Sequence, residues 1–335
     1  MFGRYRSMAT DKVENAEDEV FCTNALSALE LTIPLMQPRE LFQYKLGIRT
    51  QTFKLFCTSM NKAAAIAKTK VEAFRKQKEE DLLSATEQDS YVSKVIDRQK
   101  NDKSITYEEM VDLLFLVMSV SIDTTSAVLN WTLLHLALNP DVQSRLRDEV
   151  MGNTDNSGNI TQTGLLERNA PYMVATLRET HRITSAVPAN CVKRNGGSDV
   201  DIHGVKIAKG NVFILDSFSP GLDPNLVDNP NEFRPERWLP EAVRQREGTA
   251  AAILDHKLYA GPFSEGARKC PASRVATVEL HAVLAHLVKD WEFSVDDESV
   301  KSYKDVQYYF GLAVQPRLPK FQFTKRYQGV QPREE

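Results

Sequence analysis

The sequence of residues 261–280 is GPFSEGARKCPASRVATVEL, in which Cys270 follows a glycine-containing loop and precedes Pro271 at the predicted start of an amphipathic helix. Amide groups at the N-terminus of a helix favour a thiolate, and Arg268 and Lys269 add positive charge beside the sulfur. The thiolate is the form of cysteine that binds metal. A lone cysteine would more simply be a buried free thiol, but the pattern Phe-x-x-Gly-x-Arg-x-Cys that ends at Cys270 favours a metal ligand.

This loop resembles the haem-ligand loop of the cytochrome P-450 family, which contains phenylalanine, two glycines, arginine, the axial cysteine and a following glycine. Phe263, Gly266, Arg268 and Cys270 match that pattern. The resemblance implies that Cys270 is the axial ligand of the iron of haem b. It also implies that Arg268 binds a haem propionate and that Phe263 packs beside the thiolate. In this family, thiolate ligation favours cleavage of the O–O bond.

Several residues of the ligand region depart from the family pattern. Ser264 and Ala272 stand where the family has glycine. Because a β-carbon restricts the backbone, we expect these two residues to strain the loop or to alter the amide hydrogen bonds to the sulfur. Val192 stands where mitochondrial members of the family have an arginine that reaches a haem propionate, and Lys193 and Arg194 are the candidates to replace it.

A charged pair on another predicted helix forms the second motif. Glu179 and Arg182 lie three residues apart in the sequence RETHR, so they can pair on one helix face. The sequence FRPERW, residues 233–238, follows in a proline-rich coil. By the same resemblance, Glu179, Arg182 and Arg237 form a buried cluster. A carboxylate held between two guanidinium groups would lock the coil that leads to the ligand loop.

The third motif interrupts a long apolar helix with the sequence Asp123-Thr-Thr-Ser126. One interpretation is that the threonine hydroxyls bond back to the preceding turn and bend the helix. The resemblance implies another, in which Asp123 and Thr124 relay protons to oxygen bound at the haem, as a positioned acid and alcohol can. Val120 and Ser121 replace the small residue and the glycine that the family has here, which predicts a narrower or more polar groove.

The order of predicted elements indicates a mainly α fold with small β-sheets, which the resemblance identifies as the cytochrome P-450 fold. Helices are predicted within residues 25–88, from Ser104 or Thr106 to Asn139, and over 141–150, 171–183 and 271–290; short strands are predicted within 191–215 and 291–323, and an ordered coil over 220–240. The longest apolar run, Leu113 to Ile122, predicts a buried core helix. Glu87 is expected to be exposed. We leave residues 1–20 unassigned and expect 20–335 to be the later part of the catalytic domain, without its front portion.

Composition excludes several classes of protein. The chain has 335 residues, 42% of them hydrophobic and 26% charged, which excludes a disordered or low-complexity protein. A net charge of −3 offers no general field for nucleic acid, so no nucleic-acid partner is expected. The four cysteines lie far apart without a Cys-x-x-Cys pair. Neither a zinc ribbon nor a dense disulfide framework is therefore predicted, and a reducing compartment fits.

The resemblance implies a haem-dependent monooxygenase that hydroxylates a lipophilic, sterol-like or other lipid substrate with dioxygen and two electrons. The electrons would come ultimately from NADPH through a redox partner, either a ferredoxin or a flavoprotein reductase. The mitochondrial members are the most similar, so the mitochondrial inner membrane or the endoplasmic reticulum membrane is the expected location. Membrane association is expected only for a full-length form. The alternative is a non-catalytic remnant of the fold that acts as a helical scaffold.

Overall fold

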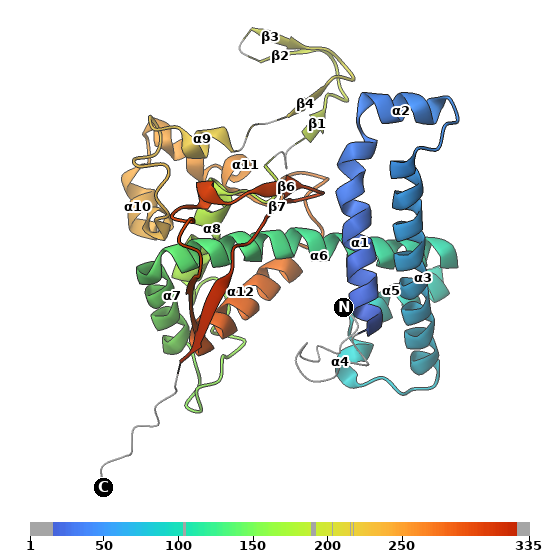
Figure 1. Cartoon of the computed structure of the whole chain (residues 1–335), viewed down its shortest axis with the longest axis horizontal. Helices are drawn as coiled ribbons and strands as arrows, with labels where there is room; N and C mark the ends of the chain where they lie inside the picture. The colour runs from blue at the N-terminus through green and yellow to red at the C-terminus, as the bar shows by residue number, and fades with distance from the viewer. Residues whose placement is uncertain are drawn as a thin grey trace. The chain divides into compact units, whose positions relative to one another are not determined.

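The computed structural model describes residues 16–102, 105–188, 192–202, 204–214, 216 and 218–326. Helices dominate, and the strands form small two-stranded sheets (Figure 1). The predicted fold class, mainly α with small sheets, is therefore confirmed. Residues 1–15 of the segment left unassigned, and the cap candidate Ser104, lie outside the described residues.

Contacts between backbone positions divide the chain into two compact units. The first unit comprises Met1–Thr124 and Phe310–Leu312, and the second comprises Thr125–Tyr309 and Ala313–Glu335. The long helix α6, Tyr107–Leu138, contributes residues to both.

The first unit is built from helices. They are α1 Ala16–Leu35, α2 Pro38–Lys45, α3 Gln51–Glu79, α4 Ala85–Gln88, α5 Tyr91–Asp102 and the first part of α6. Buried side chains on α3 recur every three or four residues, at Ala63, Ala67, Val71 and Phe74, so they form one stripe along the helix. This stripe packs into two apolar clusters, one with α1 and α6 and the other with α5 and α6.

Two capping boxes mark helix starts in this unit. The Ser84 hydroxyl accepts from the Glu87 amide, while the Glu87 carboxylate accepts from the Ser84 amide. Glu87 is buried, so the expectation of an exposed side chain was wrong, because this cap draws the carboxylate back against the backbone. Thr106 and Glu109 form the same reciprocal pair before α6, so Thr106 is the cap within the described residues.

Helix α6 is long and apolar enough to cross a membrane, judged by length and composition alone. In its most apolar window, 33% of the residues are buried. The helix was predicted to be buried in the core, and it is buried only in part. The helix ends at Leu138, and Pro140 occupies the first turn of the next helix. The predicted break at Asn139-Pro140 follows from the missing amide proton of proline, which cannot continue a helix.

The second unit surrounds an apolar core between helices and the last strands. Its α-helices are the end of α6, α7 Pro140–Gly152, α8 Pro171–Ile183, α9 Ser219–Leu222, α10 Pro240–Gln245, α11 Lys257–Ala260 and α12 Ser273–Asp290. Its 3-10 helices are η1 Pro235–Trp238, η2 Ala250–Asp255 and η3 Tyr303–Asp305. The predicted coil over 220–240 therefore contains two single turns, α9 and η1. Leu136, Leu146, Met173 and Leu284 join four helices in the main core cluster.

In the part of the chain that the structure describes, the strands pair in four small sheets. They are β1 Val192–Arg194 with β4 Val212–Ile214, β2 Val200–Ile202 with β3 Val205–Ile207, β5 Trp291–Val295 with β8 Phe321–Lys325, and β6 Tyr308–Phe310 with β7 Val314–Pro316. The first three pairs are antiparallel. In the first pair, Lys193 lies opposite Phe213. This register fixes the strand from which Lys193 and Arg194 project.

Candidate functional site

The loop from Phe263 to Cys270 is closed by a backbone hydrogen bond between its ends. The Cys270 amide donates to the Phe263 carbonyl oxygen at 2.9 Å. Within the loop, Gly266 has φ +89° and Ser264 has φ +61°, so both occupy the left-handed region. Glycine adopts this conformation without steric cost, whereas a residue with a β-carbon pays roughly 1–2 kcal/mol. The strain expected at Ser264 therefore lies in its backbone conformation.

Cys270 is a free, half-buried cysteine that precedes α12. Helix α12 begins at Ser273, and its first helical hydrogen bond is donated by the Ala276 amide to Ala272. The predicted start at Pro271 was therefore two residues too early, because residues 271–272 form a turn before the helix. Cys270 lies three positions before Ser273, the first residue of α12. It is connected to the helix by a 3.4 Å bond from the Ser273 amide to the Cys270 carbonyl oxygen.

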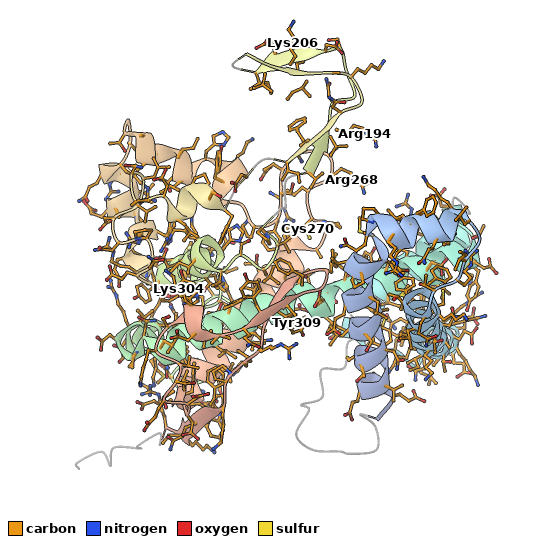
Figure 2. All side chains as sticks on the ribbon, turned by 45° about the horizontal axis from the view of Figure 1, so that its top comes forward. Arg194, Lys206, Arg268, Cys270, Lys304 and Tyr309 are labelled. Carbon is orange, nitrogen blue, oxygen red and sulfur yellow. The ribbon has the colours of Figure 1, made fainter. Side chains whose placement is uncertain are left out.

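Strand β1 lies beside this loop. Lys193 Nζ donates to the Glu265 carbonyl oxygen at 2.7 Å and lies 3.4 Å from Ser264 Oγ. Side chains alternate between the two faces of a strand, so Arg194 and Val192 project to the face opposite Lys193. Among the residues that the structure describes, the side chains of Arg194 and Arg268 have no hydrogen-bond or ion-pair partner and are exposed (Figure 2).

These groups fit a haem. A haem would need one protein donor for its iron and cations for its propionates. Cys270 offers a free thiol, and Arg268 and Arg194 offer two guanidinium groups that no described acid neutralises. A metal ion without a porphyrin is a poorer fit, because no group of three or more His, Cys, Asp or Glu residues is arranged to hold one in the described part of the chain.

Glu179, Arg182 and Arg237 are buried together in the second unit. Arg182 donates to both Glu179 oxygens, from Nε at 2.8 Å and from Nη2 at 2.7 Å, so this pair is bidentate. Arg237 Nε donates to the same carboxylate at 3.3 Å. The structure thus brings together the three residues that the second motif contains.

Other partners of this cluster have no obvious signal in the sequence. Trp238 Nε1 donates to Glu179 at 2.7 Å, and the Arg234 amide donates at 2.9 Å. Arg182 Nη1 donates to the carbonyl oxygens of Gly221 and Pro230, each at 2.7 Å. A β-carbon on Gly221 would lie 2.8 Å from Arg182 Cγ, so only glycine fits there. The proline-rich composition of the coil was the one available hint that its backbone is held in place.

Trp238 also lies against two further arginines that the sequence did not single out. The Cζ atoms of Arg178 and Arg246 lie 4.2 Å and 4.9 Å from its ring centroid. Asp255 pairs with both guanidinium groups, at 2.9 Å to Arg178 and 2.5 Å to Arg246. The tryptophan therefore joins the Glu179 cluster to a second set of ion pairs.

Asp123 and Thr124 lie on the part of α6 that belongs to the first unit, whereas Cys270 belongs to the second. Asp123 is buried. Thr124 Oγ1 donates to the Val120 carbonyl oxygen at 3.1 Å, and Ser121 Oγ donates to Met118 at 2.9 Å. The Thr124 bond is of the kind that the structural interpretation expected of the threonine hydroxyls.

Comparison with known proteins places the chain among haem proteins. Residues 2–323 match the profile of the family described as Cytochrome P450. The chain is 29% identical to Cytochrome P450 CYP12A2 of Musca domestica, over 83% of the chain and 50% of that protein. It is 29% identical to Probable cytochrome P450 12c1, mitochondrial, of Drosophila melanogaster, over 70% of the chain and 46% of that protein.

A mammalian relative is also similar. Sterol 26-hydroxylase, mitochondrial, of Mus musculus is 31% identical over 53% of the chain and 32% of that protein. The chain thus spans half or less of the length of these curated relatives. Because the family match extends over nearly all of the sequence, from the first helices through the ligand loop to the last strand, the chain belongs to the cytochrome P450 family.

Proposed function

We propose that this chain carries the haem-binding part of a cytochrome P450 monooxygenase. In that reaction one atom of dioxygen is inserted into a C–H bond of the substrate, and the other leaves as water after uptake of two electrons and two protons. The observation that carries the proposal is the closed loop between Phe263 and Cys270, which presents a free thiol before α12.

The proposed roles of the loop residues follow from their chemistry. Cys270 would ligate haem b through its thiolate, and Phe263, half-buried at the start of the loop, would limit its access to water. Gly266 would allow the left-handed turn that returns the chain to Cys270. Arg268 would bind one propionate. Arg194, which shares a strand face with Val192, would replace the arginine expected at that position, since Lys193 already bonds to the loop.

Asp123 and Thr124 are proposed to deliver protons to the reacting oxygen. The Thr124 hydroxyl proton now bonds to the Val120 carbonyl oxygen, so the hydroxyl would have to rotate to donate elsewhere. Asp123, the neighbouring acid, would restore the proton. Thr124→Ala should then lower product formed per reductant consumed without weakening substrate binding. Weaker binding with unchanged coupling would instead make Thr124 a residue of the substrate pocket.

Substrate, partners and location belong to the same proposal. The relatives include a protein named as a mitochondrial sterol hydroxylase, which supports a lipophilic, sterol-like substrate and a mitochondrial location. We propose that NADPH supplies the electrons through a ferredoxin. Residues 20–335, which include parts of both compact units, are proposed to belong to one catalytic domain.

The ligand assignment is tested by a spectrum. The chain is purified, reconstituted with haem, reduced and exposed to carbon monoxide, and its Soret band is compared with those of Cys270→Ala and Cys57→Ala. Cys57 is a half-buried thiol on α3 and serves as the matched control. A thiolate-type band in the wild type and Cys57→Ala alone is expected. The same band in Cys270→Ala would contradict the assignment, and its absence from all three would favour the non-catalytic alternative.

A further inference from the structure

Lys193 makes a contact with the ligand loop that the family comparison does not explain. Its ammonium group donates to the main-chain oxygen of Glu265 at 2.7 Å and lies within 3.4 Å of the Ser264 hydroxyl. The side chain is half-buried, and its strand is paired with β4 through three residue pairs. The backbone from which the Lys193 side chain extends is therefore held by strand pairing, outside the ligand loop.

The backbone of the ligand loop is strained at Ser264, beside this contact. Ser264 is held at φ +61°, in a region that side chains with a β-carbon rarely adopt, and it stands where the family has glycine. Only six residues separate Phe263 from Cys270, so a change in the Ser264 backbone would rotate the peptide groups that lead to the cysteine. A bond to the next carbonyl oxygen opposes that change.

The other charged groups of the loop do not compete for this ammonium group. The Glu265 carboxylate pairs with Lys269 Nζ at 3.1 Å, and this bond lowers the pKa of Glu265. Arg268 has no partner among the described residues and bears the same sign of charge as Lys193. Lys193 consequently bonds to backbone and hydroxyl oxygens, which is the contact that a positioning residue would make.

We propose that Lys193 is a positioning residue that holds Ser264 in the left-handed conformation and thereby sets the accessibility and direction of the Cys270 thiol. In this chain the lysine and the serine act as a pair: the serine introduces strain that glycine would not, and the lysine offsets it. The contact itself exists without haem. Only its consequence for iron ligation rests on the proposed function.

The first test measures the thiol of the haem-free chain. The rate at which iodoacetamide alkylates Cys270 is followed by mass spectrometry of its peptide in the wild type, Lys193→Met, Ser264→Gly and the double variant. Lys206→Met, on the exposed face of β3, is the matched control (Figure 2). Lys193→Met should change the rate by at least about twofold, the lower limit for coupled neighbours, and adding Ser264→Gly should return it to the wild-type value.

The outcomes separate this inference from the proposed function. The contact of Lys193 with Glu265 and Ser264 is called the tether in these outcomes. If Lys193→Met leaves the alkylation rate unchanged, or if Ser264→Gly does not reverse its effect, the positioning role of the tether is disproved. If Lys193→Met lowers the yield of folded chain, recovery of that yield in the double variant supports the tether, and continued loss opposes it.

The second test uses the chain reconstituted with haem. Lys193→Met should reduce the thiolate-type Soret band of the ferrous carbon monoxide complex, and the double variant should regain it. A wild type that binds no haem would overturn the proposed function, while the alkylation rates would still test the tether. A normal band in every variant, together with unchanged alkylation, would overturn the tether alone.

Discussion

Glu179 is a fully buried carboxylate whose two oxygens are both satisfied by donors. Arg182, Arg237, Trp238 and the Arg234 amide all donate to it. In a region with little water, each of these bonds is stronger than at the surface. Removing the carboxylate leaves the buried guanidinium group of Arg182 without its counter-charge, while Arg237 keeps its ion pair with Asp228. The residue therefore connects α8 to the coil that contains η1.

Glu179→Ala should lower the free energy of unfolding by about 3–5 kcal/mol, since it leaves desolvated charge behind. Glu241→Ala removes an exposed ion pair with Arg244 and should cost less than about 1 kcal/mol. Urea denaturation of both variants measures the difference. Equal midpoints would show that the buried cluster contributes no more than a surface pair.

His135 is buried at the end of α6 that belongs to the second unit. Its Nε2 lies 2.9 Å from Thr184 Oγ1, and its ring stacks on Phe233 with centroids 4.4 Å apart. Burial, with a smaller effect from the Arg182 charge, lowers the pKa of His135 to about 3. The folded protein consequently holds this imidazole neutral at pH values where an unfolded chain would protonate it.

The free energy of unfolding should fall as the pH decreases below about 6.5, because His135 then binds a proton in the unfolded chain but not in the folded protein. The loss from this residue is at most about 1.4 kcal/mol for each pH unit, until the pH approaches the folded-state pKa. His135→Gln should show a smaller loss between about pH 7.5 and about pH 5 than the wild type, as measured by urea denaturation. The exposed His286→Gln should behave like the wild type. An equal pH dependence in all three proteins would contradict the assignment.

Helix α8 is capped by a residue from another helix. Its own cap position, Ala170, has no side-chain hydrogen bond, and Pro171 has no amide proton to satisfy. Glu149 on α7 accepts instead from the amides of Tyr172 at 2.7 Å and Met173 at 2.8 Å. Burial raises the pKa of Glu149, and these two amides oppose that effect. This carboxylate thus fixes the start of the helix that carries Glu179 and Arg182.

Removing this cap should weaken α8 selectively. Glu149→Ala is expected to cost about 1–2 kcal/mol, the range of helix caps, and to increase amide hydrogen exchange in the first turns of α8. The control is Glu167→Ala, an exposed carboxylate in the preceding loop. Exchange in α8 that is equally fast in both variants would show that Glu149 does not hold the helix.

At the scale of the whole molecule, the two units have separate apolar cores. Leu114 is fully buried in the first, with Val71 and Met110, and Leu284 is fully buried in the second, with Leu136 and Leu146. Apolar clusters that share no residues can open independently, because each holds its own elements together. Helix α6 is common to both units. The amide protons at its two ends should therefore exchange at different rates.

Leu114→Ala should destabilise the first unit by about 2–5 kcal/mol and accelerate hydrogen exchange in α3 and α5 more than in α12. Leu284→Ala should do the reverse. Hydrogen exchange of both variants, followed by mass spectrometry, compares the units in one experiment. Uniform acceleration over the whole chain by either substitution would mean that the units unfold as one.

The sequence alone was sufficient for features that depend on near neighbours. The end of α6 follows from Pro140, and the pairing of Glu179 with Arg182 follows from a spacing of three residues. Thr106, the cap of α6, was one of two candidates that the sequence offered. Helical periodicity and capping bonds involve residues within about four positions, so they are visible in a local stretch of sequence. The exposed placement expected for Glu87 failed because a local signal, its cap with Ser84, was not used.

Only the tertiary structure decided the contacts that join distant segments. Lys193 reaches Glu265 across 72 positions, Trp238 reaches Glu179 across 59, and Gln143 bonds to Phe293 across 150. A lysine, a tryptophan and a glutamine could each satisfy their polar atoms with many partners. Which partner they meet depends on how helices and strands pack, because a buried polar group must take the donor or acceptor that packing brings within hydrogen-bond distance.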